Sequence, residues 1–384
     1  MARLWAQLRV LFFMGNALYL IPCRYNNETR QFDIESRFTL VAFIINISLT
    51  GVHLCFDWYQ VWNGNRYVES RTSFALILLH LLTFPAIIVY IQTFVYTARS
   101  RITAFFNGLF ADRSWQLLDD GWYVLSCRRL GRFATVATLG SALYLCVVAL
   151  GGYAFISEYR LLDTILEAFR VYVVWNAVIL YVVCVLVVRM RFRQIQAMVQ
   201  QFGTPLNNAR QWSILLQQHQ AGVSLVGDIN RLFSKFLLMM LLQVQVQVSN
   251  QLLVLYSCAH LGLASTDAEA MFLLTQFWET IFLVILIIVG YACEICHQQM
   301  DDTNRAVRNN MQLIRADNAL EGPNQEAWKR MDQFLLKTLC QATRQRFSVA
   351  EFFILDNRYV GMVLTSTITY LVILIQFKQY ELNH

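Results

Sequence analysis

Thr369-Tyr370-Leu371-Val372-Ile373-Leu374-Ile375-Gln376-Phe377 places five aliphatic residues between a Thr-Tyr pair and a Gln-Phe pair near the end of the chain. A buried amide costs several kcal/mol in hydrocarbon unless a partner satisfies it. A helix that only anchors a protein in lipid therefore has no use for Gln376. Either a neighbouring helix or a water-filled passage must meet this face, so the stretch predicts a membrane helix with one polar side.

The composition of the whole chain is that of a membrane protein. Apolar residues make up 57% and charged residues 15% of the 384 residues, which is too apolar for a soluble globule. Seven runs are long enough to cross a hydrocarbon core of about 30 Å. They lie near residues 38–56, 73–97, 133–155, 168–188, 236–261, 271–291 and 359–377. No linker or repeat divides the chain, so we predict an all-α, polytopic membrane protein with seven transmembrane helices in a single domain.

Lys and Arg are distributed unevenly between the two sides of these spans. Of the 31 basic residues, 24 fall in the N-terminal segment and in the second, fourth and sixth connections. The positive-inside rule then predicts a cytoplasmic N-terminus and, after an odd number of spans, an extracellular C-terminus. This orientation is the reverse of that of G-protein-coupled receptors and disfavours that class. The acceptor pattern Asn27-Glu28-Thr29 offers a test, because Asn27 is glycosylated only if the N-terminus lies outside.

The N-terminal segment and the two long inner connections are predicted to form further helices. An apolar run from Leu8 to Ile21, bracketed by arginines, predicts a helix against the bundle or the interface rather than a cleaved signal peptide. Residues 189–235 and 292–352 are long enough for helical extensions of the neighbouring spans, and the stripe from Trp328 to Ala342 has helical spacing. Such helices either lie on the membrane or form a packed cytoplasmic anchor layer that joins subunits.

Polar residues inside the spans predict a ligand pocket that opens to the outside. Gln243, Gln247, Asn250 and Gln251 share one stripe of the fifth span, and an acid at depth, Glu279, usually marks a site. Aromatic walls with a few amides suit a small organic molecule. The candidate lining is His80, Tyr144, Tyr172, Trp175, Asn176, Gln247, Gln251, Gln276, Trp278 and Glu279. The alternative is interhelical hydrogen bonding that only holds the bundle together.

The last span predicts a pore helix. Ser366, Thr369, Ile373 and Gln376 follow one another at i, i+3, i+7 and i+10, which makes a single stripe. Such a stripe suits a narrow aqueous path that Ile373 and Phe377 close by dewetting. One helix cannot enclose a pore, so this interpretation requires several copies around an axis. Packing of the stripe on neighbouring helices is the alternative.

Other chemistry finds little support in the sequence. Cys293-Glu294-Ile295-Cys296-His297 fits the haem-attachment pattern, but it lies at the predicted cytoplasmic end of the sixth span, which is the wrong compartment. We therefore expect no metal and no cofactor. Catalytic motifs and phosphate-binding glycine loops are absent from the sequence, so we do not expect an enzyme. The basic residues lie at membrane boundaries, and we expect no nucleic-acid partner.

The terminal run resembles the motif of insect gustatory receptors, in which Thr-Tyr, five hydrophobic residues and Gln-Phe follow one another. Glu351-Phe352-Phe353-Ile354-Leu355-Asp356 is similar to the lead-in that this family places before its last span. The remaining resemblance is architectural and consists of seven spans, an inside N-terminus and a similar length. It implies a ligand-gated, non-selective cation channel whose last span lines a central pore. Carried over, Thr369, Tyr370, Gln376 and Phe377 form the pore motif.

The resemblance also implies partners. These are a small-molecule tastant, bound in the outer half of spans two to six, and membrane lipid. The channel would be a homotetramer, or a heterotetramer with other gustatory receptors, in the plasma membrane of gustatory neurons. Its cytoplasmic extensions would form the anchor between subunits. Two alternatives stay open, namely a seven-span receptor that signals metabotropically and a non-conducting subunit of a heteromeric receptor.

Overall fold

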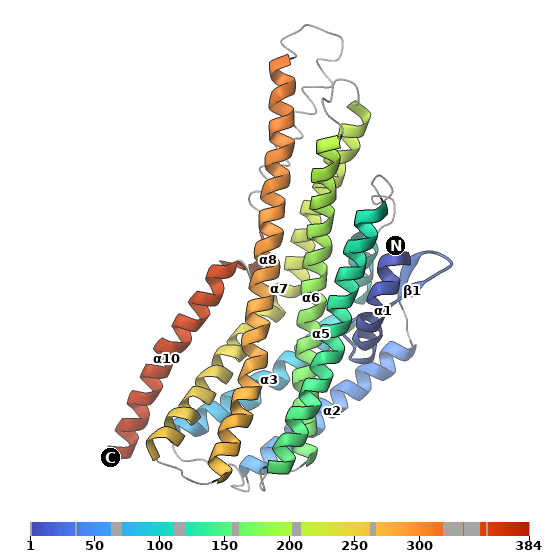
Figure 1. Cartoon of the computed structure of the whole chain (residues 1–384). Coiled ribbons are helices and arrows are strands. Elements are labelled where there is room, and N and C mark those ends of the chain that lie inside the picture. The colour runs from blue at the N-terminus through green and yellow to red at the C-terminus, as the bar shows by residue number, and fades with distance from the viewer. Residues whose placement is uncertain are drawn as a thin grey trace.

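A computed structural model describes residues 2–34, 37–62, 71–110, 120–155, 161–201, 209–261, 266–317, 333, 346–350 and 352–383. These residues are almost entirely helical (Figure 1). The helices are α1 (Ala2–Ala17), α2 (Arg37–Trp62), α3 (Arg71–Thr97), α4 (Arg99–Leu109), α5 (Asp120–Phe155), α6 (Leu161–Gln201), α7 (Ala209–Leu261), α8 (Thr266–Asp317) and α10 (Asn357–Asn383). Two short antiparallel hairpins complete the fold: β1 (Cys23–Asn26) with β2 (Gln31–Ile34), and β3 (Ser348–Val349) with β4 (Phe353–Ile354).

Seven helices in the described part of the chain are long and apolar enough to cross a membrane. They are α2, α3, α5, α6, α7, α8 and α10, so the prediction of seven spans in an all-α fold is confirmed. The polar fifth span, whose Gln-Val alternation has the period of a strand, is helical throughout α7. A helix satisfies all its backbone groups internally, which an isolated strand in lipid cannot do.

Three helices continue far beyond a membrane thickness. α7 has 53 residues and α8 has 52, and at about 1.5 Å per residue each is about 80 Å long, whereas a span needs about 20 residues. α6, α7 and α8 project together beyond the other helices at one end of the molecule (Figure 1). We call this the extension end; α6 ends there at Gln201, α7 begins there at Ala209 and α8 ends there at Asp317. The opposite end, where α10 terminates, is called the connection end. Span and extension are thus one continuous helix in each case.

α6 forms the centre of the bundle. Within its apolar span, Thr164–Gln201, an 18-residue apolar window is 89% buried, and α6 packs against α5, α7 and α8. Side chains such as Val173, Val185 and Phe192 are fully buried along it. Apolar side chains surround most of the circumference of α6, as expected of a helix that packs against others on several sides.

The N-terminal segment folds onto the outside of this bundle. α1 packs on α5, as expected of a helix against the bundle, so closely that a Cβ at Gly131 would lie 2.5 Å from Gln7 Cβ. The hairpin β1–β2, which the sequence analysis did not predict, is held by α4. Asn107 accepts a hydrogen bond from the Phe32 backbone N–H at 2.7 Å and donates one to the Phe32 carbonyl at 3.0 Å. The unpredicted strand is therefore tied to a helix by a side-chain amide.

The second hairpin positions the start of α10. Asn230 of α7 donates to the Arg346 carbonyl at 2.7 Å and accepts from Ser348 N–H at 3.3 Å. Asp356 then caps α10 by accepting the backbone N–H of Arg358 at 2.9 Å, which is the usual role of an aspartate at this position. One turn later, the buried Tyr359 hydroxyl donates to the Leu286 carbonyl of α8. α10 is therefore fixed to α8 at its first turn.

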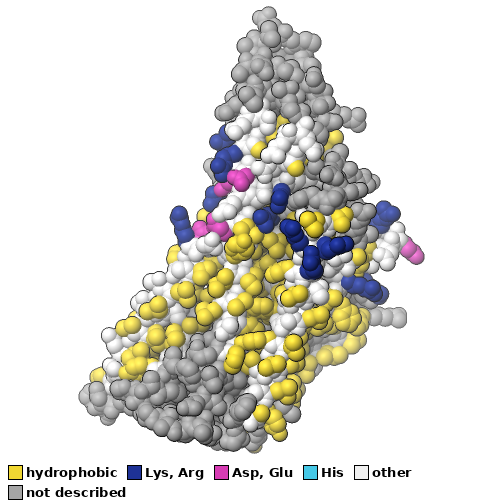
Figure 2. All heavy atoms as spheres, viewed as in Figure 1, with side chains coloured by type: hydrophobic (Ala, Val, Ile, Leu, Met, Phe, Trp, Pro, Cys, Tyr) yellow, Lys and Arg dark blue, Asp and Glu magenta, His cyan; other side chains and the backbone are white. Residues whose placement is uncertain are grey.

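Charged and apolar side chains separate on the surface. On the face shown in Figure 2, apolar side chains form a broad area around and below mid-height, and Lys and Arg gather along the upper border of this area. Three parts of the sequence interpretation lie outside the described residues: the turn Gly203-Thr204-Pro205, the stripe from Trp328 to Ala342, and the side chains of Gln276, Trp278 and Glu279.

Candidate functional site

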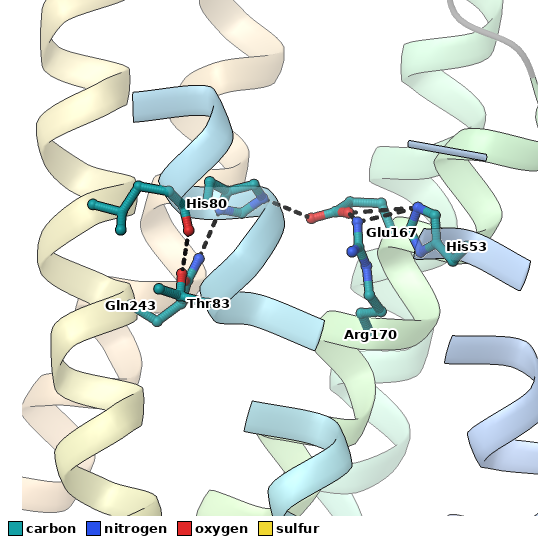
Figure 3. Close-up of polar contacts among 7 residues, drawn as sticks. His53, His80, Thr83, Glu167, Arg170 and Gln243 are labelled. Atoms are coloured by element: carbon teal, nitrogen blue, oxygen red, sulfur yellow. Dashed lines mark hydrogen bonds and ion pairs between the residues drawn. The ribbon is translucent and has the colours of Figure 1, made fainter. Parts of the chain in front are cut away.

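A polar network joins four helices in the half of the bundle toward the connection end (Figure 3). Its centre is Glu167 of α6, whose carboxylate accepts a hydrogen bond from Arg170 one turn further along the same helix. Arg170 also donates to His53 Nε2 of α2 at 3.1 Å. The spacing i, i+3 places both charged groups on one face of α6. That face meets α2 and α3.

The network continues from α6 to α7 through α3. His80 Nε2 of α3 lies 3.7 Å from Glu167 Oε1. On the other side of the ring, Gln243 of α7 donates to His80 Nδ1 at 2.7 Å, and Gln243 Oε1 accepts from Thr83. Because the amide N–H₂ can only donate, Nδ1 is the acceptor nitrogen of His80, and its proton is on Nε2, facing Glu167. His80 therefore links the Glu167 carboxylate to the Gln243 amide.

The burial of this network sets its energetic weight. Arg170 is 1% exposed and His53 1%, whereas Glu167 keeps 28% of its side chain exposed. The Arg170 guanidinium also lies 5.4 Å from the centroid of the Phe84 ring, which is a cation–π distance. Charged groups at membrane depth are costly and mark sites or pathways. Glu167 is thus the most exposed of these three residues, whereas its cationic partner is buried.

The structure places the predicted pocket residues in two groups. His80 belongs to the network, whereas Tyr172, Trp175 and Asn176 lie at the interface of α5 and α6. The Tyr172 hydroxyl donates to the Thr138 carbonyl at 3.3 Å, and Trp175 Nε1 donates to the Ala137 carbonyl at 3.1 Å. The hydrogen bonds of Tyr172 and Trp175 link α6 to α5.

Two amides of the predicted pocket retain unused acceptors. Asn176 is fully buried and donates to the Tyr172 carbonyl, but its Oδ1 has no hydrogen-bond partner within the described residues. Gln247 Oε1 of α7 is likewise buried and unpaired there. Gln251, one turn along α7, is partly buried, and Tyr144 of α5 donates to the Phe277 carbonyl of α8 at 2.6 Å. Unpaired buried acceptors are what a ligand hydroxyl or N–H would satisfy.

The predicted pore residues lie on α10, which the rest of the chain covers least. Within its apolar span, Asn357–Tyr380, an 18-residue apolar window is only 11% buried. Every residue of the predicted pore set is exposed in the single chain: Ser366, Thr369, Tyr370, Ile373, Gln376 and Phe377. The hydroxyls of Ser366 and Thr369 donate to carbonyls of α10 itself, at 2.9 and 3.0 Å. The stripe thus faces away from its own chain rather than packing inside it.

α7 connects the network to the end of α10. Leu253 of α7 packs against Leu374, and Tyr256 accepts a hydrogen bond from Gln379 at 2.9 Å. Gln243 of the network lies on the same helix, ten residues before Leu253, which is about 15 Å along the axis. One rigid helix therefore contacts both candidate sites.

Sequence reasoning missed His53, Glu167 and Arg170. An acid and an arginine three residues apart at the start of an apolar run are nevertheless a recognisable pair in the sequence. The position of His53 opposite them depends on how α2 packs on α6, which no local pattern contains.

Comparisons with known proteins agree with this architecture. The most similar solved structures include the insect olfactory receptor OR5 from Machilis hrabei, with a TM-score of 0.67, 11% identity, and coverage of 98% of this chain and 97% of that chain. The same receptor in complex with eugenol gives a TM-score of 0.69 and 12% identity, and covers 97% of this chain and 99% of that chain. No curated protein matches the chain by sequence. Residues 8–381 do match the sequence model of the 7tm chemosensory receptors, and the chain therefore belongs to the 7tm chemosensory receptor family.

Proposed function

We propose that this chemosensory receptor is a gustatory receptor that works as a ligand-gated, non-selective cation channel. The observation that carries the proposal is the exposed polar stripe on α10, which ends in the Gln376-Phe377 pair of the gustatory receptor motif. An apolar span that leaves Thr369 and Gln376 uncovered by its own chain needs a polar environment. Several copies of α10 around an aqueous axis supply that environment.

The proposed ligand is a small organic tastant that binds between α3, α5, α6 and α7. The unpaired oxygens of Asn176 and Gln247 offer acceptors, and Glu167 and His80 offer a polar wall. The eugenol complex of the related olfactory receptor supports a small ligand by analogy. Ligand binding would shift the closed–open equilibrium by its difference in affinity for the two states. α7 is the proposed link, because it contacts both the polar network and α10.

The proposed orientation places the N-terminus and the extension end in the cytoplasm. The supporting observations are the positive-inside bias and the border of Lys and Arg above the apolar surface (Figure 2). The helical extensions of α6, α7 and α8 would form the contacts between subunits. Asn27 tests the orientation: a glycosidase-sensitive mobility shift that disappears in Asn27→Gln would reverse it.

The channel proposal is tested by current recordings from the full chain in cells that lack the relevant G proteins, with a panel of tastants and volatile odorants. Ligand-evoked cation current would exclude the metabotropic and non-conducting alternatives. Gln376→Ala is expected to change conductance or ion selectivity, whereas Ile368→Ala, exposed on a different side of α10, should leave both unchanged. Unchanged permeation in a conducting Gln376→Ala channel would remove α10 from the pore.

A further inference from the structure

A polar cavity lies at the start of α10, away from the network of Figure 3. It has a volume of about 290 Å³ and is lined by α8 and by the residues that lead into and begin α10. Glu294, His297, Gln298 and Asp301 form its α8 wall, at the helical spacing of one face. Arg346, Asp356, Asn357 and Arg358 form the opposite wall. The cavity adjoins the point where α8 and α10 leave the apolar bundle.

His297 lines this cavity and has an unused ring donor. Its side chain is 5% exposed, and its Nε2 accepts a hydrogen bond from the Phe347 backbone N–H at 2.9 Å. The proton of the neutral ring is therefore on Nδ1. Within the described residues Nδ1 has no hydrogen-bond partner. A buried donor without a partner is costly, so an acceptor in the cavity would be favoured there.

The charged groups around His297 are of both signs. Asp301 pairs with Arg346 at 3.4 Å, Glu294 accepts from Gln298 at 2.9 Å through one oxygen, and Asp356 Oδ1 is used by the α10 cap. The Arg358 side chain is exposed at the cavity rim. Donors for an anion therefore come from His297 and Arg358, and acceptors for a cation come from the second carboxylate oxygens of Glu294 and Asp356. A ligand of one sign would leave the other set facing like charge.

We propose that this cavity binds a phosphate–ammonium zwitterion of the phosphoethanolamine type. The phosphate would accept from His297 Nδ1–H and the Arg358 guanidinium, as phosphates do from arginine elsewhere. The ammonium would donate to Glu294. Because the cavity lies where α10 meets the end of the apolar bundle, the zwitterion is either a free metabolite or the headgroup of an ethanolamine phospholipid. Its two walls belong to α8 and to the start of α10, so a bound ligand would brace that joint.

The test measures binding directly and does not rest on the channel proposal. The full chain in phosphatidylcholine nanodiscs is titrated with O-phosphoethanolamine, and separately reconstituted with increasing phosphatidylethanolamine, with bound lipid counted by native mass spectrometry. Saturable binding of free O-phosphoethanolamine identifies a metabolite, and enrichment of the lipid alone identifies a headgroup. Absence of both overturns the proposal.

Variants localise the site and test its double charge. Arg358→Gln is expected to weaken binding about tenfold or more, because it removes a charge-assisted contact. His297→Gln deletes the Nδ1 donor while its amide oxygen can still accept from Phe347, and it should weaken binding severalfold. Arg305→Gln, an exposed arginine paired with Asp302 on α8, is the matched control and should leave affinity within twofold. Equal loss in Arg305→Gln and Arg358→Gln would refute the site.

Glu294→Gln distinguishes a zwitterion from a plain anion. Loss of the carboxylate should weaken O-phosphoethanolamine and strengthen inorganic phosphate, since one loses its ammonium partner and the other loses a repulsion. If the variant strengthens both probes alike, the ammonium makes no contact with Glu294 and the proposed ligand class is wrong.

Discussion

α6 and α10 are both apolar enough to cross a membrane, yet the chain treats them in opposite ways. The apolar window of α6 is 89% buried and that of α10 is 11% buried. α6 also has its buried charge, Arg170, paired within the same chain, whereas Ser366, Thr369 and Gln376 of α10 are exposed in the single chain. The difference teaches that the stability of the single chain resides around α6. The environment that α10 requires must come from outside the chain.

The largest expected effect comes from breaking the charge pair on α6. Arg170→Met leaves the Glu167 carboxylate without its cation among buried neighbours, and removing one partner of a buried pair costs about 3–5 kcal/mol. We expect a large drop in the thermal midpoint of the purified protein in nanodiscs. A rise in thiol-reactive dye signal above the baseline from the exposed Cys55 and Cys146 reports unfolding, because Cys184, Cys293 and Cys296 are buried.

The matched double variant decides whether the loss is electrostatic. Glu167→Gln combined with Arg170→Met removes both charges, and replacement of a whole buried pair is often close to neutral. The double variant should therefore regain most of the lost stability. A double variant as unstable as Arg170→Met would show that packing against Phe84, rather than the pair, supports this part of α6.

A smaller effect is expected where α10 touches the bundle. A Cβ at Gly290 of α8 would lie 2.8 Å from Tyr359 Cε1 and 3.0 Å from Val360 Cγ2. Tyr359 is fully buried and hydrogen-bonded to Leu286, so it cannot move away freely. Overpacking costs about 1–3 kcal/mol, and the gain from replacing a helical glycine offsets about 1 kcal/mol. We expect Gly290→Ala to lower the thermal midpoint moderately, whereas Gly140→Ala, with open space around it, should not.

The hairpin β3–β4 before α10 should contribute less to stability than the contact at Gly290. Asn230→Ala removes two hydrogen bonds that hold the strand β3 to α7, one of them at 3.3 Å, and we expect a loss of about 1 kcal/mol. The released segment should become easier to cleave, so limited proteolysis between residues 346 and 356 is the sensitive measurement. Unchanged cleavage would mean that the His297–Phe347 contact holds the hairpin without Asn230.

Much of this contrast was predictable from local sequence. Hydrophobic run length identified all seven spans, and periodicity placed Ser366, Thr369 and Gln376 on one side of the last. The exposure of that side agrees with a polar stripe that does not pack inside its own chain. The hairpin β1–β2 was not predicted, because its strands are only four residues long and depend on Asn107, 75 residues further along the chain.

The network was harder to predict, for a physical reason. His53, His80 and Gln243 come from three helices, and their meeting with Glu167 depends on how those helices cross. The sequence marked His80 as a site residue through its depth, and it marked the amide stripe of α7. It did not select Glu167, because Glu167 lies one residue before the predicted fourth span, whereas Glu279 lies inside the predicted sixth.

The smallest effect on stability is expected on the exposed stripe of α10. Thr369→Ala and Gln376→Ala truncate side chains that touch little of their own chain, and surface substitutions usually stay within about 0.5 kcal/mol. Dye-monitored unfolding of both variants in a detergent that keeps the chain monomeric should match the parent protein. In the assembled protein the same changes should alter the thermal midpoint or the subunit stoichiometry, because there the stripe has neighbours. If neither state responds, α10 faces only lipid, and the contrast with α6 would reflect a peripheral span rather than a helix that completes its surroundings with other copies.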